Sequence, residues 1–207
     1  MATTSVTTGG TATAKRGRPR SFDREAALEQ ALRLFWERGY EATSVADLTA
    51  AMGIRPPSLY AAFGDKRALF DEVIARYRET YGAYSTRAMD EEPTARAGIA
   101  RMLHESAAEA TDPEHPWGCL MISSTVNCTS PEVAEAVREL RNANVRALES
   151  RIRADVAAGH EPPGTDPAAL ANFTAVVLQG MSQRARDGAT RAELEQVAAD
   201  AMRIWPA

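Results

Sequence analysis

The stretch "GIRPPSLYAAFGDKRALF", residues 53–70, decides the fold of the first third of the chain. Two prolines stand before an apolar segment, and proline suits the first turn of a helix, where no backbone N–H donor is needed. A short helix is therefore expected from Pro56 to about Phe63. Leu59 and Phe63, four residues apart, would share its buried face.

Helical periodicity continues on both sides of this stretch, and no strand-like alternation appears. Ser21 or Asp23 can cap the first helix, Gly39 can end it, and Thr43 or Ser44 can cap the second. The first three helices have the size and spacing of a helix-turn-helix unit. The expected fold is all-α, with helices at about residues 23–38, 44–52, 56–63, 65–84, 93–110, 131–156, 167–186 and 192–205.

Composition is that of an ordinary globular protein, with 207 residues, 44% hydrophobic and 25% charged. The net charge is −4, yet "KRGRPR", residues 15–20, carries four cations and no acid, which favours local contact with a phosphate backbone. No run of about 18 apolar residues suggests a membrane span. Because the first residues lack the apolar region of an export signal, a cytoplasmic protein with reduced thiols is expected.

Other chemistries have little support in the sequence. His104, His115 and His160 lack metal-ligand spacing, so neither a metal nor a cofactor is expected. Cys119 and Cys128 lie nine residues apart, and buried structural thiols are favoured over a redox or electrophile sensor. An enzyme with Cys119 as nucleophile would need a paired base, and none stands at a recognisable spacing, so no catalytic residue is assigned.

"ALRLFWERGYEATSVADL" (31–48) followed by "SLYAAFGDKRALF" (58–70) resembles the DNA-binding domain of the TetR family of transcriptional repressors. This resemblance implies an all-helical homodimer that binds double-stranded DNA at a palindromic operator and is released by a small-molecule effector. It divides the chain into a disordered tail (1–14), a three-helix DNA-binding domain with a basic arm (15–66), and an effector and dimerisation domain (67–207). "PWGCL" and "LQGMSQRARDGAT" look like segments common in one branch of the family.

The resemblance also assigns the DNA contacts. Arg55 would enter the major groove, Tyr60 and Lys66 would hold the backbone, and the basic arm would reach an adjacent minor groove. Many family members have a polar residue followed by glycine where this chain has Pro56 and Pro57. Since proline cannot hydrogen-bond to a base edge, base reading is expected to depend on Arg55 and on apolar contacts. The predicted contacts are Arg16, Arg18, Arg20, Thr43, Ser44, Arg55, Pro56, Pro57, Ser58, Tyr60, Ala61 and Lys66.

The second domain is expected to hold an effector cavity and the dimer interface. For each cavity candidate, plain core packing is the competing interpretation; Asn144 stands out because it shares an apolar stripe, where an unpaired amide is costly. Gly180 would permit close approach of two subunits at the interface. The cavity candidates are Met102, Trp117, Cys119, Met121, Asn127, Asn144 and Phe173, and the interface candidates are Leu170, Phe173, Val177, Gly180, Met181, Leu194, Val197, Ala201 and Trp205.

Overall fold

The computed structural model describes residues 22–205, and within this range every regular element is a helix, which confirms the all-α prediction. The predicted tail and the arm residues Arg16, Arg18 and Arg20 lie outside the described residues. The elements are α1 (Arg24–Arg38), α2 (Val45–Met52), α3 (Pro56–Phe63), α4 (Lys66–Glu79), α5 (Ala83–Glu91), α6 (Ala95–Ala110), α7 (Leu120–Ser123), α8 (Pro131–Ala157), α9 (Pro167–Arg186), α10 (Arg191–Ala201) and a 3₁₀ turn, η1 (Met202–Ile204).

Helices α1 to α3, which we call the reader, begin where the sequence predicts. The Asp23 side chain accepts hydrogen bonds from the first turn of α1, and Ser44 forms a reciprocal capping box with Asp47 at α2. Pro56 opens α3 at a position that needs no N–H donor. The predicted inward residues Leu59 and Phe63 are buried, which confirms the orientation expected for α3.

The expected fourth helix is interrupted, which corrects the prediction of one helix over residues 65–84. α4 ends at Glu79, and α5 begins at Ala83 after a turn. The Thr80 hydroxyl donates to the Arg76 carbonyl (2.8 Å), and the Gly82 N–H donates to the Tyr77 carbonyl (2.8 Å). These bonds satisfy the carbonyl groups at the helix end, while the apolar spacing continues across the turn and hides it in the sequence.

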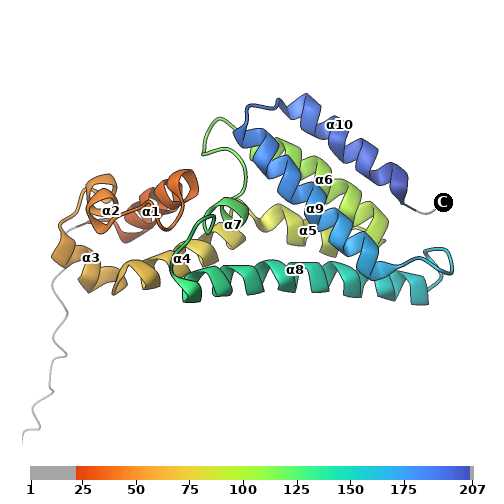
Figure 1. Ribbon diagram of the computed structural model, residues 1–207, viewed down its shortest axis with the longest axis horizontal. Helices are drawn as coiled ribbons and strands as arrows, with labels where there is room; N and C mark the ends of the chain where they lie inside the picture. The colour runs from red at the N-terminus through yellow and green to blue at the C-terminus, as the bar shows by residue number, and fades with distance from the viewer. Residues whose placement is uncertain (1–21, 206–207) are drawn as a thin grey trace, which may run out of the picture.

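Figure 1 shows the reader at one end of the molecule and α4 leading away from it toward α5 to α10. Helix α6 packs against α5, α9 and α10, and α8 packs against α9. The core of the reader is not confined to its own helices: it includes α4 and also Leu120, Met121, Val133 and Val137 from α7 and α8. No helix within residues 22–205 has the length and apolar character needed to cross a membrane.

The loop at residues 111–119 lies between the reader and α9, and Gly118 packs closely against α9. Gly118 has φ +85°, and a Cβ there would lie 2.9 Å from the Ser182 carbonyl oxygen and 2.9 Å from Cγ of Arg186. Gly159 also has a positive φ (+76°), but a Cβ there would meet nothing within 4 Å. The two glycines therefore share the backbone constraint and differ in packing.

Gly118→Ala is expected to lower the free energy of unfolding by about 2–4 kcal/mol, because a positive φ costs roughly 1 kcal/mol and overpacking adds about 1–3. The matched control Gly159→Ala should lose only about 1 kcal/mol. Urea unfolding at fixed protein concentration measures both. Equal losses would contradict the close packing of the loop against α9.

Candidate nucleic-acid interface and central cavity

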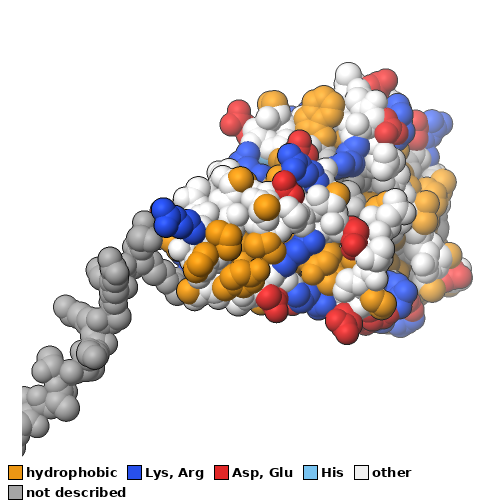
Figure 2. Space-filling view, turned by 60° about the vertical axis from the view of Figure 1, so that its left-hand side comes forward, with side chains coloured by type: hydrophobic (Ala, Val, Ile, Leu, Met, Phe, Trp, Pro, Cys, Tyr) orange, Lys and Arg blue, Asp and Glu red, His pale blue; other side chains and the backbone are white. Residues whose placement is uncertain are grey.

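The outer face of α3 is the candidate DNA-reading surface. Arg55, Pro56, Pro57, Tyr60 and Ala61 are all exposed there. Arg55 is the N-cap residue of α3 but makes no side-chain cap bond, so its guanidinium is not used to hold the helix. Hydrophobic side chains gather on the surface at this end of the molecule, beside the grey residues in Figure 2. Apolar and methyl contacts can thus accompany any hydrogen bond from Arg55 to a base.

Arg24 holds the C-terminal end of α3 in place, a role that the sequence did not reveal. Its Nη2 atom lies 2.6 Å and 2.7 Å from the carboxylate oxygens of Glu72 on α4 and 3.3 Å from the carbonyl oxygen of Ala62. Its guanidinium also lies 4.4 Å from the Phe63 ring centroid. One side chain of α1 therefore contacts both α3 and α4. The only sequence signal is an arginine in the first turn of α1, which is not distinctive.

The two residues predicted to touch phosphate at the start of α2 differ in exposure. Thr43 is completely buried, and its hydroxyl donates to the Gly39 carbonyl (2.7 Å), closing the turn between α1 and α2. This burial argues against the phosphate contact expected for Thr43. Ser44 is exposed at the N-terminus of α2, where backbone N–H groups favour an anion.

Lys66, the predicted backbone clamp, lies at the first position of α4. Its ammonium is 4.2 Å from the Tyr40 ring centroid. Burial lowers the pKa of Lys66, while the nearby Glu41 carboxylate acts in the opposite direction. The aromatic ring thus holds the ammonium near the reader surface at the N-terminus of α4, which is a suitable place for a phosphate group.

A cavity of about 630 Å³ lies among α4 to α9. Of the cavity candidates, Met102, Cys119, Met121 and Asn144 line it. Asn144 is exposed rather than buried, so its position on the apolar stripe creates no unpaired buried amide. Lining residues include the apolar Met89, Met102, Met121, Ile122, Val145, Leu148 and Leu178, and the polar Tyr77, Tyr84, Ser106, Glu109, Cys119, Arg141 and Gln179.

Three predicted cavity residues do not line this space. Trp117 is 43% exposed on the loop before α7, and Phe173 is 36% exposed on α9. Asn127 is exposed in the turn between α7 and α8, where it adopts a left-handed backbone conformation (φ +58°). All three side chains lie on other surfaces because helix rotation and loop direction, not residue type, decide what a side chain faces.

Cys119 lies at the end of the cavity nearest the reader. The Tyr77 hydroxyl donates to its Sγ atom (3.2 Å), and its backbone N–H donates to Oγ of Ser182 (2.9 Å). Burial raises the pKa of the Cys119 thiol, although the Tyr77 hydroxyl acts in the opposite direction. Cys128 does not line the cavity, and its thiol lies 3.6 Å from the Ser130 carbonyl oxygen. The partner of the Cys119 sulfur is a phenol rather than a base, which does not fit a catalytic nucleophile.

The predicted interface residues divide into two groups. Leu170, Met181, Leu194, Ala201 and Trp205 are buried within their own subunit, which corrects their assignment to the dimer surface. Phe173, Gly180 and Val197 are exposed and Val177 is half-buried on α9 and α10, so these four stay available to a partner. Val176 on α9 (65% exposed) and Ile204 directly after α10 (52% exposed) add to this exposed apolar surface.

Comparison with known proteins assigns the chain to a family. Residues 27–73 match the family described as "Bacterial regulatory proteins, tetR family", and residues 95–201 match "Tetracyclin repressor-like, C-terminal domain". The chain is 38% identical over 194 residues to the HTH-type transcriptional repressor ComR of Escherichia coli (strain K12), covering 92% of each chain. The chain belongs to the TetR family.

Other relatives agree with this assignment. The repressor BdcR of the same organism is 30% identical over 185 residues, which is 89% of this chain and 88% of BdcR. A solved structure of the TetR-family regulator CifR, a triple cysteine mutant in complex with 26-bp operator DNA, is 44% identical with a TM-score of 0.86. It covers 92% of this chain and 100% of that chain. As a TetR-family protein, the chain is a helix-turn-helix transcriptional regulator.

Arg55→Ala is expected to relax base preference at one position per half-site, at a cost of about 1–3 kcal/mol, because it removes a base-edge contact. Lys66→Ala should instead weaken binding to all sequences about equally and reduce the salt slope by roughly one per lost phosphate contact.

Selection of bound duplexes from a random pool and binding titrations at several salt concentrations separate the two effects. Arg203→Ala, at the far end of the chain, serves as the control that should change neither. An unchanged selected motif for Arg55→Ala would refute the assignment of that residue.

Proposed function

We propose that this TetR-family protein is a cytoplasmic homodimeric repressor that binds a palindromic DNA operator and releases it when a small molecule occupies the central cavity. The observation that carries the proposal is the combination of an exposed recognition face on α3 with a fold close to that of CifR, whose structure includes operator DNA. In a two-fold dimer, two recognition helices about 34–36 Å apart, or a multiple of this, would meet successive major grooves.

The dimer proposal rests on the outer face of α9 and α10. Phe173, Val176 and Gly180 recur at spacings of three and four on α9, and Val197 is 44% exposed on α10. A second copy that packs the same two helices against this face would form a four-helix interface around a two-fold axis. A Cβ at Gly180 would meet nothing within 4 Å in the single subunit, so its open surface leaves room for close approach of the partner.

The ligand proposal rests on the cavity. Its volume, about 630 Å³, lies within the range of sites for drug-sized molecules, and its wall combines methionine and leucine side chains with a few polar groups. A ligand can weaken DNA binding only by as much as it prefers the arrangement that does not bind DNA. A non-covalent ligand is favoured because burial raises the pKa of Cys119 and so lowers its thiolate fraction.

Covalent sensing through Cys119 is the second candidate. It is favoured by one observation: the sulfur lines the cavity and accepts a hydrogen bond from Tyr77, which stabilises a thiolate. An electrophile in the cavity would then form a bond to sulfur. The two candidates differ in their dependence on the thiol, so Cys119→Ser separates them.

Selection of duplexes from a random pool is the first test of the function, and one enriched palindrome is expected. A library of small molecules is then screened for release of the selected duplex, with the wild-type protein and Cys119→Ser side by side. Equal release from both supports a non-covalent ligand, while release from the wild type alone supports covalent sensing. Failure to enrich any sequence would overturn the repressor proposal.

Val176→Asp is expected to give a monomer, because a carboxylate buried without a partner at the dimer interface costs several kcal/mol. Val126→Asp is the matched control: Val126 is 64% exposed, as Val176 is 65% exposed, but it lies in the turn after α7. Sedimentation velocity and circular dichroism distinguish dissociation from unfolding. A Val176→Asp dimer of normal affinity would place the interface elsewhere.

A further inference from the structure

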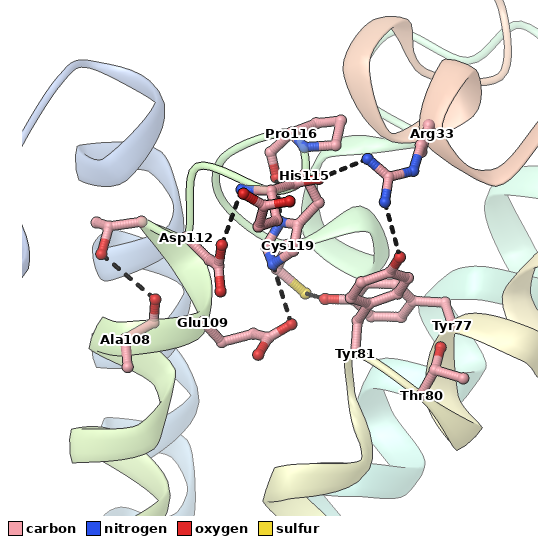
Figure 3. A network of polar contacts seen from close by, with 12 residues as sticks. Arg33, Tyr77, Thr80, Tyr81, Ala108, Glu109, Asp112, His115, Pro116 and Cys119 are labelled. Carbon is pink, nitrogen blue, oxygen red and sulfur yellow. Dashed lines mark hydrogen bonds and ion pairs between the residues drawn. The ribbon is translucent and has the colours of Figure 1, made fainter. Parts of the chain in front are cut away.

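The segment "HPWGC", residues 115–119, contacts several parts of the molecule, and Figure 3 shows two of these contacts, from His115 to Glu109 and from Cys119 to Tyr77. The His115 ring stacks on Trp36 of the reader, with centroids 4.5 Å apart and an interplanar angle of 21°. The Trp117 carbonyl lies 3.5 Å from Nη1 of Arg186 on α9, and the Cys119 sulfur contacts Tyr77 at the cavity. Reader, proposed dimer helix and cavity therefore meet at this segment.

His115 is a buried ionisable group at this junction. Its side chain is only 4% exposed, and its Nε2 atom lies 3.2 Å from Oε1 of Glu109, an ion-pair distance without hydrogen-bond alignment. Its Nδ1 atom lies 3.0 Å from the Pro116 carbonyl oxygen. Both ring nitrogens therefore face oxygen atoms that accept hydrogen bonds. Only the doubly protonated ring, the imidazolium, carries a proton on both nitrogens and a positive charge beside the Glu109 carboxylate.

The charges around His115 come from every element packed against it. Burial lowers the pKa of His115, but Glu109, the Pro116 carbonyl and Asp112 outweigh this effect, so the pKa is raised above its ordinary value. Other charged groups, on α1 and α9, contact the residues that lie against His115 or next to it in the chain. Arg33 on α1 donates to the Glu114 carbonyl and to the Tyr81 hydroxyl (3.3 Å). The Tyr81 hydroxyl in turn donates to Glu29, also on α1. Arg186 on α9 donates to the Trp36 carbonyl.

Glu109 connects this cluster with the cavity. It lies one residue before the end of α6, where it lines the cavity and also faces His115. Its neighbour one turn earlier, Glu105, bonds instead to Arg101 (2.7 Å) and Arg87 (3.0 Å). A ligand group that donates hydrogen bonds or carries positive charge would compete with His115 for the Glu109 carboxylate.

We propose that Glu109 and His115 are positioning residues that couple the cavity to the reader, with the charged pair favouring the arrangement that binds DNA. The proposal rests on the proposed function. The pair is intact in this structure, where the His115 ring also stacks on Trp36 of α1. A ligand with a cationic or hydrogen-bond-donating group would draw Glu109 away, remove the partner of the imidazolium and loosen its stack on Trp36 of α1.

The proposal fixes the sign of a pH dependence. The imidazolium, and with it the pair, is present below the pKa of His115 and is lost as the pH rises through that value. Operator affinity should therefore fall as the pH rises. The chain has three histidines, and the other two, His104 and His160, have side chains 60% and 52% exposed and lie outside the reader. Any contribution of His104 or His160 to the pH dependence of operator affinity can be removed by substituting each of them separately.

The test is titration of the full-length protein with its selected operator duplex by fluorescence anisotropy, from pH 5.5 to 8.5 at fixed ionic strength. Wild-type affinity should fall several-fold across this range, up to about tenfold per subunit for each unit of difference between the His115 pKa values of bound and free protein. His115→Gln and Glu109→Gln should bind more weakly at low pH and show flat profiles. Glu105→Gln and His104→Gln should keep the wild-type profile.

A flat wild-type profile, or an unchanged profile in His115→Gln, would overturn the proposal while leaving operator binding, and so the proposed function, intact. If His115→Gln does not fold by circular dichroism, the His115 pKa is measured by NMR in wild-type protein with and without the duplex. A higher pKa in the complex is expected, because linkage is reciprocal. Equal values in the two states would also overturn the proposal.

Discussion

The burial of Trp36 is the constraint on which the arrangement of the whole subunit depends. Its side chain has no exposed surface. Tyr77 and Tyr81 meet it edge-on at centroid distances of 4.9 Å and 5.1 Å, and His115 stacks on it. Its carbonyl oxygen also accepts a hydrogen bond from Arg186 on α9. A large side chain of α1 can be removed from water only if α4, the turn before α5 and the loop at residues 111–119 close around it.

This packing joins the reader to the rest of the chain. One continuous core includes α1 to α4, α7 and the first turns of α8, so the reader cannot rotate without repacking against these elements. Close-packed interiors change between discrete arrangements more readily than they deform gradually. Helix α4 carries Lys66 at its first residue and Tyr77 two residues before its end, beside Cys119. The proposed DNA contact of Lys66 and the cavity contact of Tyr77 thus lie at opposite ends of α4.

The candidate DNA-reading face follows from the two prolines with which α3 begins. They start the helix without using an N–H donor, and they leave an exposed surface of rings and methyl groups in place of hydrogen-bonding side chains. In the proposed function, base discrimination by hydrogen bonding would depend on Arg55, whose guanidinium does not cap the helix. Arg24 fixes the other end of α3 through Glu72 and the Phe63 ring. A short helix is thereby held at both ends while its outer face stays exposed.

The sequence by itself determined the fold class, the reader and most helix boundaries. These depend on local signals: proline at the first turn of α3, Ser44 and Thr190 in capping boxes, and Gly39 and Gly53 after helix ends. The turn at residues 80–82 was missed because apolar spacing continues across it. The inward direction of Leu59 and Phe63 also followed from spacing alone.

Only the tertiary structure decided which apolar faces are inside the subunit and which lie open to a partner. Leu170 and Phe173 are three residues apart on one helix, yet one is buried and the other exposed, because α9 carries apolar residues on two faces and packing selects one. The same holds for Asn144, which packing leaves exposed, for Thr43, which it buries, and for His115, whose ring packs on Trp36 of α1. Periodicity fixes the faces of a helix, but the face that turns inward depends on the surfaces of its neighbours, which no local stretch of sequence contains.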